Sequence, residues 1–325
     1  MSEEGEELWV ETPRERLRAR LISDRQRSRI LSVEDRVAKI VKGSARVREN
    51  PLVDRELAVW LSRSRRSWNQ LSKQTHPGLL RVGDRVVDNY GDEGYLCQNL
   101  TVYELEDPLH PARVSLRDFL RCAIQLSRAV GVMHREGFVH GDITPSNVCF
   151  HHDLPVLIDF EMMVKFGQFV SVEAEDSQHQ EICCTPPCCS PEQVLRERVT
   201  FSADVFCLGL TFLSWISERF GVGYAYLGQT IRDSMEMCAR AEYPHWDVIE
   251  TRLEESAVID VLTRAIELVP CDRYANADHL AEELEALLRT LPDESLDQPL
   301  DGDLNIDLSQ FDDLTDLLDP SIDPF

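Results

Sequence analysis

The hydrophobic pattern of the chain shifts from mainly strand-like to mainly helical after Asp107-Pro108, and this change constrains the fold more than any other feature. Arginine and apolar residues alternate through residues 14–22. A period of two is typical of a half-exposed β-strand. Residues 115–136 instead place apolar side chains at helical spacing. The sequence therefore predicts an α+β protein with a small antiparallel sheet lobe followed by a larger, mainly α-helical lobe.

The first part of the chain predicts five short strands and one helix. The expected strands cover residues 14–22, 27–33, 36–41, 79–90 and 94–104. Ser23-Asp24 supplies a turn between the first two strands, and residues 90–94 supply one between the last two. Residues 54–66 mix apolar and charged side chains at near-helical spacing, which favours a helix. The arginines of residues 14–29 are expected on the solvated face of the sheet.

The second part predicts a long helix and then further helices. Ser115 is the N-cap candidate of the helix over residues 115–136, and Gly137 marks its end. Its apolar face consists of Leu116, Phe119, Leu120, Ile124, Leu126 and Val130. A loop, two short strands and a run of helices to about residue 289 are expected after it.

Composition narrows the possible partners and compartments. The chain carries 58 acidic and 34 basic residues, a net charge of −24, so we expect neither nucleic-acid nor anionic-membrane binding. The N-terminus has no apolar core, and no apolar stretch approaches 18 residues, so neither a signal peptide nor a membrane span is expected. Ten cysteines without a signal peptide favour free thiols in a reducing compartment. The predicted location is intracellular and cytoplasmic.

One short segment carries residues suited to phosphoryl transfer. Residues 140–147 follow the pattern H-x-D-x-x-x-x-N, in which a turn can bring Asp142 and Asn147 together. Asp142 can then accept a hydrogen bond from a hydroxyl substrate, while Asn147 offers Mg²⁺ an oxygen ligand. An apolar strand at residues 156–158 delivers Asp159, a second metal ligand, at its end.

These residues resemble the catalytic loop and the D-F-G segment of eukaryotic-type Ser/Thr protein kinases. Residues 184–193 (CTPPCCSPEQ) resemble the segment where a protein substrate docks, with Thr185 shaping it. Residues 202–209 (SADVFCLG) resemble a motif in which Asp204 braces the catalytic loop from a buried helix. Residues 271–274 (CDRY) resemble a late motif whose Arg273 pairs with Glu192. His140 has a structural role in this family.

The resemblance also implies an ATP site in the small lobe. Residues 37–41 (VAKIV) resemble the strand whose lysine, here Lys39, contacts the ATP phosphates; Lys42 is the competing candidate. Glu56 on the following helix is the implied partner of Lys39. Residues 100–106 resemble the hinge that holds adenine, which puts Glu104, Leu105 and Glu106 beside the base. The implied fold is bilobal, and the implied cofactors are ATP and Mg²⁺.

The chain departs from the family pattern at several positions. Residues 21–35 contain no glycine, although the loop that covers the phosphates is normally glycine-rich. Arg25, Arg27 or Arg29 is expected to contact phosphate instead. Gly141 replaces the arginine before the catalytic aspartate, which predicts activity without activation-loop phosphorylation. Glu161 replaces the glycine after Phe160 and is expected to restrict switching of that segment. Thr144 replaces a lysine.

Alternatives remain open at the sequence level. The departures allow a pseudokinase that acts as a scaffold or allosteric regulator, and H-G-D also occurs in small-molecule phosphotransferases. The tract His179, Cys183, Cys184, Cys188 and Cys189 allows zinc binding or thiol-based regulation, although small unreactive side chains are favoured.

The predicted organisation has four parts. Residues 1–13 are a disordered acidic lead, residues 14–106 the small lobe, residues 107–290 the large lobe, and residues 291–325 a disordered acidic tail. The last segment interleaves acids with Leu, Ile and Phe. It is expected either to solubilise the chain or to dock through residues 304–319. The implied partners are a protein substrate and either a partner or an intramolecular surface for the tail.

Overall fold

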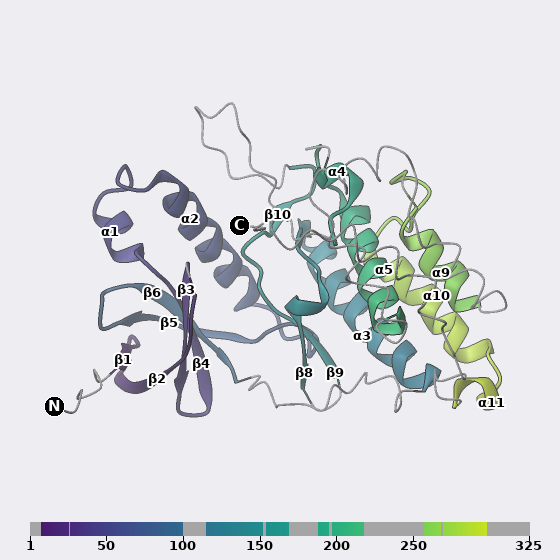
Figure 1. Ribbon diagram of the computed structural model, residues 1–325, viewed down its shortest axis with the longest axis horizontal. Coiled ribbons are helices and arrows are strands. Elements are labelled where there is room, and N and C mark those ends of the chain that lie inside the picture. The colour runs from purple at the N-terminus through teal and green to yellow at the C-terminus, as the bar shows by residue number, and fades with distance from the viewer. Residues whose placement is uncertain are drawn as a thin grey trace, which may run out of the picture.

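The computed structural model describes residues 8–25, 27–99, 115–151, 154–168, 188–194, 197–217, 257–267 and 269–297. Two lobes lie next to each other along the long axis of the molecule, a β-rich one and a mainly helical one (Figure 1). This arrangement agrees with the predicted α+β class. Among the described residues, no helix has both the length and the apolar character that crossing a membrane requires.

The small lobe is a closed antiparallel barrel of six strands. They are β1 (Leu8–Glu11), β2 (Arg16–Asp24), β3 (Ser28–Val33), β4 (Arg36–Val41), β5 (Val82–Asp88) and β6 (Glu93–Gln98). Their order is β1-β2-β3-β4-β6-β5, and pairing of β1 with β5 closes the barrel. Residues 8–11 were predicted to belong to a disordered lead; that prediction is wrong because β1 finds pairing partners on both sides.

A β-bulge breaks the predicted alternation of β2. Leu17 is buried and Arg16, Arg18 and Arg20 are exposed, as the period of two predicts. The pairing of β2 with β3 then shifts register between Leu21 and Ser23. An extra residue in one strand turns the following side chains to the other face. Leu21 and Ile22, at the bulge, are 44% and 51% exposed.

Two helices, not the predicted one, accompany the barrel: α1 (Ser44–Glu49) and α2 (Arg55–Leu71). Asp54 caps α2 by accepting a hydrogen bond from Leu57 N at 2.8 Å. A buried carboxylate fastens α2 to the sheet, because Arg65 of α2 and Arg85 of β5 both donate to Glu93 of β6. The Trp68 ring also packs on Tyr95, with centroids 4.4 Å apart.

The large lobe is built around α3 (Leu116–Arg135), which confirms the predicted helix and its cap. Ser115 accepts from Asp118 N, and Gly137 has φ 79° just beyond the helix end. The other elements are β7 (Phe138–Val139), the 3₁₀ turn η1 (Pro145–Asn147), β8 (Val148–His151), β9 (Leu154–Leu157), β10 (Val164–Lys165), α4 (Pro191–Val194), α5 (Phe201–Ser217), α9 (Ala257–Ala265), α10 (Ala277–Thr290) and α11 (Asp293–Leu296). Helix α3 and α5 form the core with apolar side chains such as Phe119 and Phe212.

Helix α10 packs closely along α3 at a glycine. A Cβ on Gly131 would lie 2.4 Å from Asp278 Oδ1, so only glycine leaves room for that carboxylate. Arg128 Nη1 donates to the same oxygen at 3.1 Å, and Arg135 donates to the other one. A glycine inside a helix, which costs about 1 kcal/mol in propensity, is thereby explained by tertiary contact.

The predicted boundary of the tail at residue 291 is too early. Helix α11 follows directly, and its Leu296 is 1% exposed. Arg117 of α3 donates to Asp293 and Asp297 at 2.7 Å each. Residues up to Asp297 therefore belong to the large lobe, whereas residues 298–325 lie outside the described residues.

Candidate active site

A buried aspartate fixes the catalytic loop between β7 and β8. Asp204 of α5 accepts hydrogen bonds from His140 N at 2.7 Å and Gly141 N at 3.0 Å. His134 Nε2 donates to it at 3.0 Å, and His134 Nδ1 accepts from Ala277 N. Since Gly141 has φ 78°, glycine suits this position. Asp204 was predicted to brace the catalytic loop from a buried helix, and its hydrogen bonds to the loop backbone agree with that prediction.

Asp142 and Asn147 face each other across the loop. Asn147 Nδ2 donates to the carbonyl oxygen of Asp142 at 2.9 Å and to Asp142 Oδ2 at 2.8 Å. Asn147 N also donates to Thr144 O at 3.0 Å, which closes the η1 turn. With both amide hydrogens directed at Asp142, the Asn147 oxygen is the atom that is available to bind a metal.

Asp159 joins this pair because the β8–β9 hairpin carries it back to the loop. Ile158 N donates to Asn147 O at 2.9 Å, directly before Asp159. Asp159 has φ 59°, an uncommon value for a residue with a side chain. Phe160 then packs edge-on against His140, with ring centroids 4.9 Å apart, and its carbonyl accepts from Ser67 of α2 at 2.6 Å. Burial lowers the pKa of His140, although the carboxylates of Asp204, Asp142 and Asp159 act in the opposite direction.

Lys39 of β4 reaches the same place from the small lobe. Its Nζ lies 2.9 Å from Asp159 Oδ1 and 2.9 Å from Glu161 Oε1. Lys42, the competing candidate, points elsewhere and contacts Asp24 Oδ1 at 2.6 Å and Arg25 O at 2.9 Å. Lys39 is therefore the lysine placed beside the predicted metal ligand.

The electrostatics of this cluster favour a charged lysine. Burial alone would lower the pKa of Lys39, but the carboxylates of Glu161 and Asp159 outweigh burial and raise it. Burial opposes ionisation of Asp159 as well, and Lys39 nevertheless holds the Asp159 pKa below its ordinary value. For Glu161 burial dominates, so its pKa rises to about 7 despite Lys39.

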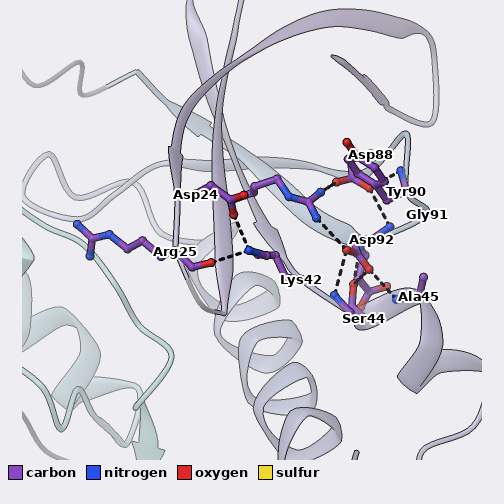
Figure 2. A network of polar contacts seen from close by, with 12 residues as sticks. Asp24, Arg25, Lys42, Ser44, Ala45, Asp88, Tyr90, Gly91 and Asp92 are labelled. Carbon is purple, nitrogen blue, oxygen red and sulfur yellow. Dashed lines mark hydrogen bonds and ion pairs between the residues drawn. The ribbon is translucent and has the colours of Figure 1, made fainter. Parts of the chain in front are cut away.

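A polar network fixes the glycine-free turn between β2 and β3 (Figure 2). Lys42 holds the turn through Asp24 and the Arg25 carbonyl. Arg29, a predicted phosphate ligand, instead pairs with Asp88 and lies 3.6 Å from Asp92. That prediction is wrong for Arg29, because two buried carboxylates bind its guanidinium inside the lobe. Arg27 lies over the Trp60 ring, whereas the Arg25 side chain extends away from the network in Figure 2.

The donor set fits Mg²⁺. Asp159 supplies a carboxylate that is 36% exposed, and Asn147 supplies an amide oxygen. Hard oxygen donors on a partly exposed edge are the ligands that Mg²⁺ prefers when it also binds phosphate. Asp159 and Asn147 would hold the ion.

Several predicted site residues cannot be placed. The Glu56 side chain, the hinge residues Glu104, Leu105 and Glu106, and Thr185 lie outside the described residues. Of the cysteine tract, Cys183 and Cys184 also lie outside them, and within the described ranges no three His, Cys, Asp or Glu side chains gather as a metal site would require.

Glu192 and Arg273 meet inside the large lobe in a bidentate ion pair. Beside them Gln193 Nε2 donates to Gly141 O at 2.7 Å, a link from α4 to the catalytic loop that the sequence analysis missed. The only sequence signal for it was the place of Gln193 at the end of the P-E-Q motif.

A family model described as the protein kinase domain matches residues 54–284, which is most of the chain. The chain belongs to the protein kinase domain family. Asp142, Asn147 and Asp159 lie inside the matched range, whereas Lys39 and strands β1–β4 precede it.

The relatives of the chain include bacterial proteins that are named as serine/threonine kinases. Serine/threonine-protein kinase D of Synechocystis is 27% identical over 158 residues, covering 48% of this chain and 29% of the relative. A probable serine/threonine-protein kinase of Streptomyces coelicolor is 25% identical over 236 residues, covering 71% and 34%. PknA of Mycobacterium tuberculosis is 29% identical over 156 residues, covering 44% and 34%. The aligned part of this kinase domain spans about a third of each relative's length.

Proposed function

We propose that this kinase domain transfers the γ-phosphoryl group of ATP to a serine or threonine hydroxyl of a protein. The observation that carries the proposal is the convergence of Lys39, Asp142, Asn147 and Asp159. The backbone bond from Ile158 N to Asn147 O and the contact of Lys39 with Asp159 join the three segments that supply them. The names of the bacterial relatives support the choice of Ser and Thr.

Each side chain has a role that follows from its surroundings. The Asp142 carboxylate, held by Asn147, orients the attacking hydroxyl by accepting its hydrogen bond. Lys39 keeps its charge because two carboxylates raise its pKa, so it provides a positive group for the α- and β-phosphates. Asp159 and Asn147 hold Mg²⁺, which offsets the negative charge of the phosphates when it is bound. Glu56 and Thr185 keep the roles implied by the resemblance, as predictions.

The glycine at position 141 supports activity without activation-loop phosphorylation. An arginine at this position would provide a cation for a phosphate on the activation segment. Gly141 has no side chain, and its backbone N–H is already bonded to Asp204. We infer that the loop geometry depends on Asp204 and Gln193 rather than on an added phosphate.

The test is transfer of radiolabelled phosphate from ATP to a generic protein substrate. Wild type is compared with Asp142→Asn, which removes the acceptor charge and keeps the shape. We expect labelling by wild type and a loss of at least about 100-fold in the variant, the typical effect of removing a general base. Equal labelling by both proteins would refute the assignment of Asp142.

One observation favours a second candidate, a scaffold or allosteric regulator without catalysis. The β2–β3 turn is free of glycine, and Lys42 ties it to Asp24 and Arg25 O, so backbone N–H groups approach phosphates less easily. Thermal unfolding with Mg²⁺ and ATP discriminates the two, because a ligand that binds the native state raises the melting temperature. An unchanged melting temperature favours the scaffold.

A further inference from the structure

The side chain of Glu161 lies on Lys39, at a position where the family pattern has glycine. Lys39 Nζ is 2.9 Å from Glu161 Oε1, the same distance as from Asp159 Oδ1. Glycine has no side chain for such a contact. A second carboxylate, two residues beyond Asp159, therefore contacts the proposed phosphate-binding lysine.

The two carboxylates differ in exposure. The Glu161 side chain is 8% exposed, and the Asp159 side chain is 36% exposed. Nucleotide and metal arrive from the solvent side, so they meet Asp159 first. An ammonium has three N–H donors. If Asp159 held a metal, the buried Glu161 carboxylate would remain beside the Lys39 ammonium, which would keep donors for the phosphates.

The backbone around Glu161 is held in place. Phe160 is buried against His140, and its carbonyl accepts from Ser67 Oγ at 2.6 Å. A buried carboxylate without a partner is costly, and Lys39 is the cation that faces Glu161 among the described residues. Tyr95 of β6 also lies close to Lys39 and Glu161, since the charges of both groups influence the pKa of its hydroxyl. Glu161 thus belongs to the segment of Asp159, and Ser67 links that segment to helix α2.

We propose that Glu161 is the positioning residue of Lys39, the role that the family resemblance gives to Glu56 of α2. This inference rests on the proposed function of Lys39 as the phosphate-binding lysine. Its consequence is that the segment of Asp159, which Ser67 ties to α2, sets the position of the ammonium.

The first test measures coupling between Lys39 and Glu161 without any nucleotide. Melting temperatures are compared for Lys39→Met, Glu161→Gln and the double variant. We expect the double variant to melt within about 1 °C of the less stable single variant, since both substitutions remove the same interaction. The same cycle of Lys39 with Glu136, an exposed residue at the end of α3, is the additive control. Additive losses for Glu161, or larger coupling for Lys39 with Glu56, overturn the proposal.

The second test measures the affinity for ATP with Mg²⁺. Glu161→Gln is expected to weaken binding about 10-fold in the wild-type background and less than about twofold in the Lys39→Met background. Glu161→Asp, which retains the charge, should recover part of the loss. Equal weakening in both backgrounds shows a merely structural role and overturns the proposal. If wild type binds no nucleotide, the proposed function fails, and the melting-temperature cycle still decides the role of Glu161.

Discussion

Arg273 and Glu192 form a two-pronged ion pair inside the large lobe, with Nη1 to Oε1 at 2.9 Å and Nη2 to Oε2 at 3.1 Å. Both side chains are almost fully buried, and Arg273 also donates to the carbonyl oxygens of Ser202 and Glu267. The pair joins two segments that are 81 positions apart in the sequence. Its geometry explains why breaking it should be costly.

Arg273→Ala leaves the Glu192 carboxylate buried without its cation. Removing one partner of a buried ion pair typically costs about 3–5 kcal/mol of unfolding free energy. Urea denaturation measures the loss. Arg289→Ala is the matched control because Arg289 is exposed and pairs with Glu285 only at 4.0 Å; a change of at most about 0.5 kcal/mol is expected there. Similar losses in both variants would contradict the prediction.

The ion pairs between α3 and α10 can be tested by the pH dependence of the stability of Asp278→Asn. Burial opposes ionisation of Asp278, but hydrogen bonds from Arg135 and Arg128 outweigh it and hold the pKa below 3.8. A lowered folded-state pKa means stability that is present above the unfolded value and is lost as pH falls through the folded value. Wild type should therefore be more stable than Asp278→Asn at pH 7 by about 1–2 kcal/mol.

The difference between the two proteins should shrink steadily below pH 4, as Asp278 takes up a proton. Chemical denaturation at several pH values measures it. Asp35→Asn, at a residue exposed on the β3–β4 turn, should show no comparable pH-dependent difference. A constant difference for Asp278→Asn across the whole range would mean that charge is not what holds the junction.

Gly141→Ala should impair catalysis as well as stability. A Cβ at φ 78° strains the backbone by about 1–2 kcal/mol, and here the strain falls between His140 and Asp142. Gly137→Ala is the matched control, since Gly137 has φ 79° with nothing within 4 Å of the added Cβ. Both variants should lose similar stability, while phosphate transfer per folded molecule falls only in Gly141→Ala. Normal transfer by Gly141→Ala would show that the loop tolerates the strain.

Treatment with a protein phosphatase should leave the transfer rate unchanged. The reason is the absence of a side chain at Gly141, together with the hydrogen bonds that already hold the loop: Gly141 N donates to Asp204, and Gln193 donates to Gly141 O. Mass spectrometry verifies that phosphate has been removed before the rate is measured. Abolished transfer after treatment, restored by rephosphorylation, would contradict the inference.

Two truncated chains, one with α11 and one without it, test whether α11 stabilises the large lobe. A chain ending at Asp297 retains Leu296 and the partners of Arg117, whereas a chain ending at Leu291 loses them. Burial of one leucine contributes about 1.5–3 kcal/mol. The shorter chain should therefore unfold at lower urea concentration than the longer one. Equal midpoints would show that α11 adds nothing to the large lobe.

The sequence predicted most elements because their signals are local. Arg36–Val41 and Leu116–Arg135 follow from hydrophobic period and capping, which depend on residues close in the chain. Leu8–Glu11 was missed because a four-residue strand in an acidic stretch has no period of its own. It becomes a strand only through partners in β2 and β5, which close the barrel.

The sequence by itself determined the order of the catalytic motifs and therefore which residues are candidates for the site. The tertiary structure decided which charges meet. Arg29, expected at phosphate, reaches Asp88 across 59 positions, and Lys39 reaches Asp159 and Glu161 across 120 or more. Such pairings depend on how the barrel closes and on which groups burial forces to find a partner. A local sequence pattern contains neither kind of information, so the contact of Glu161 with Lys39 follows only from the tertiary structure.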